Sequence, residues 1–203
     1  MYLSHICYLV LNTLSNSSNG HINDWNIGCH YKLIEKLTKL MNDNPTNHRT
    51  KLYLLDNLIA DYRLEEAESI LDKSNLDIEP FYRVWIQEVQ VGFMSMKSKY
   101  ESLLNEQRHN WKILMSIANR YAFNRNYEEA ILIYEKTFEI APKPRYIDML
   151  ACIAYLYRSI GNDKKAIETY HRELTLLKEE WNITKGELVE EIKQNMEELK
   201  NKY

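Results

Sequence analysis

The sequence predicts an all-α protein: a right-handed superhelix of antiparallel helix pairs, an α-solenoid closed by a C-terminal capping helix. One pattern of small and large apolar residues occurs twice between Trp111 and Glu180, and its key alanines, Ala130 and Ala166, lie 36 residues apart. A fixed period of roughly 20 to 50 residues is typical of stacked repeat units. The chain also has only five Gly and four Pro, too few for the many tight turns of a β-sandwich.

The two copies of the pattern predict where helices touch. Small residues allow two backbones to approach, and large residues fill the space beside them. Gly or Asn in the segments 124–126 and 159–162 can take the left-handed conformation that ends a helix. The first copy comprises Leu114, Ile117, Ala118, Tyr121, Ala130, Tyr134 and Pro142; the second comprises Leu150, Ile153, Ala154, Tyr157, Gly161, Ala166 and Tyr170.

This spacing resembles the tetratricopeptide repeat, whose signature positions match the seven residues of the first copy. Where that family usually has Gly, both copies have Ala; where it usually has Ala, they have Thr137 and Glu173. These departures leave the predicted fold unchanged and affect only the pitch of the superhelix. The resemblance implies a tetratricopeptide-like α-solenoid whose concave surface is lined by the first helix of each pair.

In the rest of the chain, apolar residues at helical spacing predict further helices. A polar segment from Ser15 to about Asn26 predicts a loop. Thr184 to Glu187 predicts a capping box before the last helix. We expect two parts, 1–46 (N-terminal helices and loop, packed on the array) and 47–203 (the repeats and capping helix, one continuous domain). The expected helices are Met1–Leu14, Tyr31–Met41, Leu52–Ile59, Leu64–Leu71 with Ala67 in the small position, Phe81–Phe93, Lys97–Gln107, the four repeat helices and Leu188–Leu199.

Composition excludes several classes of function. The 26 basic and 29 acidic side chains give a net charge of −3 without a basic block, which argues against direct nucleic-acid binding. Three widely spaced cysteines make a disulfide framework improbable and favour a cytoplasmic location. The apolar stretch Met1–Leu14 lacks the flanks of a signal peptide and is too short to span a membrane.

Catalytic and metal-binding patterns are absent from the sequence. It has no phosphate-binding Gly-rich loop, no His-Glu-x-x-His and no Gly-x-Ser-x-Gly. His5, Cys7, Cys29 and His30 lack the two-to-four-residue gap of a structural zinc site. We therefore predict no enzyme activity, no cofactor and no metal.

The candidate site is the predicted concave surface. Asn can bond both backbone groups of an extended peptide, and aromatic residues supply anchoring area. The candidate residues for binding a protein or peptide are Lys112, Asn119 and Phe123 in the first copy, Asp148, Tyr155 and Arg158 in the second, and Tyr82 and Trp85 upstream.

The segments 166–170, 176–183 and 186–188, with Trp85–Glu88 upstream, resemble the bacterial transcriptional activator domain of antibiotic regulatory proteins. The resemblance implies a sensing or protein-contacting module in regulation. The winged-helix DNA-binding domain usual in that family does not fit into the roughly 45 residues before the first repeat-like helix. An alternative is a structural subunit, such as a homodimer joined through Met1–Leu14.

Overall fold

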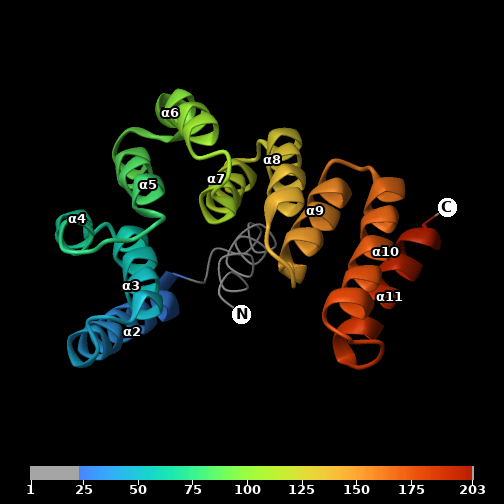
Figure 1. The fold of residues 1–203 in the computed structure, drawn as a ribbon, viewed down its shortest axis with the longest axis horizontal. Helices are drawn as coiled ribbons and strands as arrows, with labels where there is room; N and C mark the ends of the chain where they lie inside the picture. The colour runs from blue at the N-terminus through green and yellow to red at the C-terminus, as the bar shows by residue number, and fades with distance from the viewer. Residues whose placement is uncertain (1–22, 203) are drawn as a thin grey trace. The chain divides into compact units, whose positions relative to one another are not determined.

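The computed structural model describes residues 23–202, and within them the chain is entirely helical (Figure 1). This confirms the all-α prediction. The expected helix Met1–Leu14 lies outside the described residues. The helices are α2 (Asn23–Asp43), α3 (His48–Ala60), α4 (Leu64–Asp72), α5 (Glu79–Val91), α6 (Phe93–Glu106), α7 (Trp111–Phe123), α8 (Tyr127–Ile140), α9 (Ile147–Ser159), α10 (Asp163–Glu180) and α11 (Glu187–Lys200).

The described residues divide into two compact units, 23–106 with α2 to α6 and 107–202 with α7 to α11. Within each unit, helices that follow one another along the chain pack together. The boundary expected between residues 46 and 47 falls inside the first unit. None of the helices in residues 23–202 has the length and apolar character that a membrane crossing requires.

Three helical hairpins, α3–α4, α7–α8 and α9–α10, share one turn. Each contains a residue of positive φ, namely Tyr62 at 59°, Arg125 at 61° and Gly161 at 75°. In each, the next residue's backbone N–H reaches back to a carbonyl of the preceding helix, with N···O distances of 2.8 to 2.9 Å. The positive-φ residue itself donates to a second carbonyl at 3.0 to 3.1 Å. This is the Schellman motif, which satisfies carbonyls that the end of a helix leaves unpaired.

A buried alanine follows each turn by five residues. Ala67, Ala130 and Ala166 are all 0% exposed, and each donates its backbone N–H to the residue that caps its own helix. Tyr134 and Tyr170, four residues further on, are buried beside the last two alanines. The alanines that the sequence predicts at helix contacts are thus fully buried in these hairpins, and Ala67 occupies the same position in the first unit.

Helix α11 covers the end of the second unit. Val189, Ile192, Met196 and Leu199 are buried and form one apolar cluster with residues of α9 and α10, including Ala154 and Leu177. Of the residues predicted for the apolar face of the last helix, Ile192, Met196 and Leu199 are confirmed as buried, whereas Leu188 is exposed and Val189 packs instead.

The structure corrects three expectations about helix ends. Helix α2 begins at Asn23, inside the expected loop, and α6 begins at Phe93, directly after Gly92, rather than at Lys97. The predicted capping box is wrong, because Gly186 caps α11 and no side chain bonds to its first turn. Gly186 has φ 121°, a conformation that is costly for a residue with a Cβ.

The alanine contact gives a first prediction. Ala166→Asp should lower the free energy of unfolding by on the order of 4 kcal/mol, because it buries an unpaired carboxylate between helices. Chemical denaturation measures the loss. Lys164→Asp places the same carboxylate on an exposed position of α10 and should cost far less. Equal stability of the two variants would contradict the packing described above.

The shared turn gives a second prediction. Gly161→Ala should destabilise the chain by about 1 kcal/mol, because an L-residue is strained at positive φ. No atom lies within 4 Å of the added Cβ, so the cost is conformational rather than steric. Arg125→Gly, at the matching position, should instead stabilise the chain. Thermal unfolding of both variants tests the pair, and the same sign in both would refute it.

Candidate functional site

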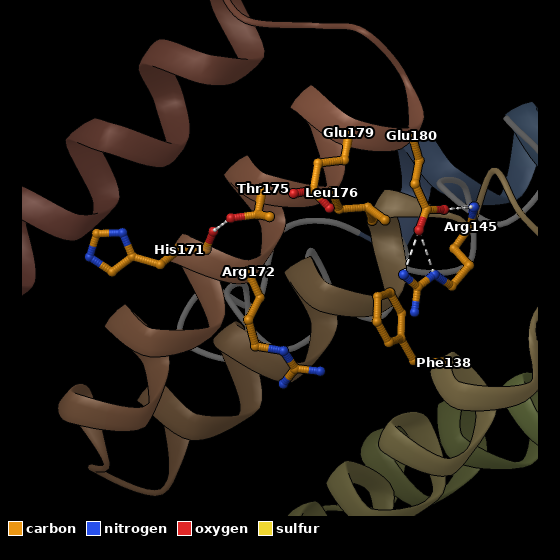
Figure 2. A pocket seen from close by; sticks show the side chains of 8 residues that line it. All are labelled: Phe138, Arg145, His171, Arg172, Thr175, Leu176, Glu179 and Glu180. Carbon is orange, nitrogen blue, oxygen red and sulfur yellow. Dashed lines mark hydrogen bonds and ion pairs between the residues drawn. The ribbon is translucent and has the colours of Figure 1, made fainter.

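A recess of about 320 Å³ lies on the second unit, between α8, the segment before α9, and α10 (Figure 2). Its wall combines one aromatic ring, two guanidinium groups and two carboxylates around the buried side chain of Leu176. The lining residues are Phe138, Arg145, His171, Arg172, Thr175, Leu176, Glu179 and Glu180. All of them belong to one unit, so the recess is defined without reference to the other.

Phe138 occupies the centre of one wall. The guanidinium carbon of Arg145 is 4.1 Å from the centre of the phenyl ring, and that of Arg172 is 5.5 Å away. In Figure 2 the ring lies between these two side chains. Arg172 also holds Glu135 through two hydrogen bonds of 2.6 and 2.7 Å. Cation–π attraction and paired hydrogen bonds thus fix both arginines in place.

Arg145 is held more tightly still. Its Nε donates to Glu180 Oε1 at 3.0 Å, Nη2 donates to the same oxygen, and its backbone N–H donates to Glu180 Oε2 at 2.8 Å. The indole N–H of Trp181 donates to the Arg145 carbonyl at 2.8 Å. These bonds from Arg145 hold the pKa of the Glu180 carboxyl below its ordinary value. The result is a rigid corner that joins the start of α9 to the end of α10.

The recess keeps hydrogen-bonding capacity for another molecule. A guanidinium has five N–H donors. Arg145 uses Nε and Nη2 on Glu180, and Arg172 uses Nη1 and Nη2 on Glu135. Among the described residues, these bonds use neither Arg145 Nη1 nor Arg172 Nε. Chemically, the recess can hold a carboxylate beside a flat aromatic surface.

Sequence reasoning missed these residues, although the sequence carried a signal for them. Glu135 pairs with a residue 37 positions later, and Arg145 pairs with one 35 positions later. Both separations are close to the repeat period. Glu135 and Arg172 lie on successive hairpins, whereas Arg145 and Glu180 lie at the two ends of one hairpin, α9–α10. Opposite charges one period apart are the pattern that could have predicted the recess.

Two candidate residues of the predicted concave surface form hydrogen bonds within the second unit. Asn119 on α7 is buried, and its Oδ1 accepts a hydrogen bond from the hydroxyl of Tyr134. Its Nδ2 is buried without a hydrogen-bond partner. Arg158 on α9 donates from Nη1 to Tyr170 Oη at 3.4 Å and to Asn195 Oδ1 at 3.1 Å. Arg158 thus links α9, α10 and α11.

The other predicted residues of this unit are partly or fully accessible. Lys112 and Phe123 on α7 are exposed, and the guanidinium of Arg120 lies 4.7 Å from the Phe123 ring centre. Asp148 and Tyr155 on α9 are half-buried. Burial raises the pKa of the Asp148 carboxyl.

Tyr82 and Trp85 belong to the first unit, on α5. Tyr82 is buried, and its hydroxyl donates to Asp56 Oδ1 at 2.7 Å. Burial raises the pKa of Asp56 to about 7, although the bond from Tyr82 opposes this rise. Trp85 is half-buried, with its ring 5.8 Å from that of Phe81 and 5.9 Å from that of Tyr82. Both aromatic residues pack within their own unit.

Cys152 corrects the expectation drawn from the cysteine count. It is buried on α9, and its sulfur takes part in a disulfide bond. The candidate zinc ligands His5, Cys7, Cys29 and His30 lie outside the described side chains. Among the described residues, no three His, Cys, Asp or Glu are grouped so as to hold a metal ion.

Glu173 on α10, like Asp56, is a carboxylic acid whose pKa burial raises strongly. It is 2% exposed, and its Oε2 has no hydrogen-bond partner. Burial, together with repulsion from Asp148 and Glu191, raises its pKa from 4.5 to about 8. A protonated Glu173 is therefore the form that the folded chain favours at neutral pH.

This shift gives a pH prediction. Between pH 4.5 and about 8 the folded chain holds a proton on Glu173 that the unfolded chain has lost, so stability falls as the pH rises through that window. Glu173→Gln should remove this part of the pH dependence. Urea denaturation at pH 6 and pH 9 measures it, with exposed Glu168→Gln on the same helix as the control. An unchanged pH slope in Glu173→Gln would contradict the assignment.

Comparison with known proteins adds no assignment: no protein-family model matches the chain, and no match to a curated protein was found.

Proposed function

We propose that this chain is a non-enzymatic helical-repeat module that binds a protein or peptide. The proposal includes the tetratricopeptide-like superhelix, for which the turn and alanine shared by three hairpins are the support. A role in bacterial regulation follows only from the resemblance to transcriptional activator domains.

The observation that supports binding most directly is the recess of Figure 2. Arg, Trp and other aromatic residues dominate the energetics of protein interfaces. Here Arg145, Arg172 and Phe138 line one recess, and Trp181, 39% exposed, is bonded to Arg145. Their side chains are already held by Glu135 and Glu180. Such preorganisation lowers the entropy that binding costs.

The partner chemistry follows from the unused donors. Arg145 Nη1 and Arg172 Nε can donate to one carboxylate, while Phe138 and Leu176 offer apolar contact. A protein segment that carries an acidic side chain next to an apolar one satisfies both. The candidate residues of the predicted concave surface on α7 and α9 form a separate candidate surface, on which Phe123 is exposed and Tyr155 is half-buried.

The test begins with a pull-down from the native host, and then measures the affinity of each retained partner by calorimetry. Arg172→Ala and Phe138→Ala should each weaken binding about tenfold or more, as interface anchors do. Lys136→Ala, on an exposed position of α8, is the matched control. Thermal unfolding checks that each variant stays folded.

The results separate the two surfaces. If Tyr155→Ala loses affinity and Arg172→Ala does not, the partner binds the predicted concave surface and not the recess. Partners that bind all four variants with native affinity would refute both. If the retained partner is the chain itself, sedimentation velocity distinguishes the alternative of a structural homodimer.

A further inference from the structure

The first turn of α11 exposes an apolar side chain among acidic ones. Leu188 is 40% exposed, although the sequence predicts it on the buried face, and Val189 packs against α9 and α10 in its place. Glu187 and Glu190 are exposed on the same turn. Negative charge is favourable at the N-terminus of a helix, which accounts for the acids. It does not account for a leucine left in water.

Glu187 is available to a donor from outside the chain. The two ion pairs that α11 forms within the described residues are those of Glu190 and Glu197 with lysines further along the helix. Glu187 belongs to neither. The preceding residues 184–186 are exposed as well. Another molecule can therefore reach a carboxylate and an apolar side chain that are neighbours in the sequence.

The recess of Figure 2 has the matching chemistry. The bonds of its two arginines within the described residues use neither Arg145 Nη1 nor Arg172 Nε, and Phe138 supplies a flat apolar surface. Its volume of about 320 Å³ is small for a binding cavity and suits two side chains. Neither Glu187 nor Leu188 lines the recess of its own chain, so a second copy is needed to bring them there.

We propose that the recess binds residues 187 and 188 of a second copy of this chain. Glu187 accepts hydrogen bonds from the two remaining arginine donors, and Leu188 packs against Phe138. The inference rests on the proposed function of the recess and names its partner. Opposite charges and apolar surfaces then meet, as at specific interfaces. Because the contact joins two different patches, it is heterologous, and one copy can hold a neighbour through each.

Sedimentation velocity of the full chain over the micromolar to millimolar range tests the contact. The weight-average sedimentation coefficient should rise with concentration, because an interface this small is weak. Phe138→Ala and Leu188→Ala should each weaken the association about tenfold or more, as the loss of an interface anchor predicts. Lys136→Ala and Glu197→Gln, exposed on α8 and α11, are the matched controls and should associate like the native chain. Thermal unfolding checks that every variant is folded.

Mixing the two variants separates a lost contact from a general defect. The Phe138→Ala chain keeps residues 187 and 188 intact, and the Leu188→Ala chain keeps the recess intact. At a concentration at which neither associates alone, the mixture should therefore form pairs. These pairs should grow no further, since each copy lacks its second surface.

A native chain that stays monomeric, a mixture without pairs, or native-like association of both variants overturns the inference. The proposed function is judged separately. If the native chain is monomeric while Phe138→Ala lowers the affinity for a partner retained in the pull-down, the recess binds that partner and the second copy is excluded.

Discussion

Complete burial of one alanine after the turn is the constraint on which each hairpin depends. Ala67, Ala130 and Ala166 have no exposed surface, and each stands five residues after a residue of positive φ. A larger side chain would push the helices apart, and a different turn would change the residue that faces the partner helix. Turn and alanine therefore act together, and they recur in both units of the chain.

Repetition of the hairpin also positions the polar surface. When two hairpins stack, residues one period apart lie at similar heights on neighbouring helices, so charges can pair across them. Glu135 with Arg172 is such a pair, and Arg145 with Glu180 joins the two ends of one hairpin. They hold two guanidinium groups around Phe138 and so create the recess. The recess is thus a product of the repeat rather than an addition to it.

The hairpins could be predicted from the sequence because small residues and turn residues recur at a fixed period, which is a local and repeated signal. The recess was harder to predict, because its signal is a pair of opposite charges some 35 residues apart, and the roles of Phe138 and Arg145 depend on those distant partners. The ends of helices were also harder to predict from the sequence. Arg125 adopts a backbone conformation that is usual for Gly, and Gly186 rather than Thr184 caps α11. The burial of Asn119 depends on its bond with Tyr134, which spacing alone does not reveal.

The corner formed by Arg145, Glu180 and Trp181 has a mechanical consequence. Helices α9 and α10 are joined covalently at one end by the turn at Gly161 and non-covalently at the other by this corner. A protease that cuts the turn therefore leaves two fragments. They are still held together by the bonds of this corner and by the apolar surface that α9 and α10 share. The pair should survive such a nick as a noncovalent complex, and its covalent continuity is dispensable once it has folded.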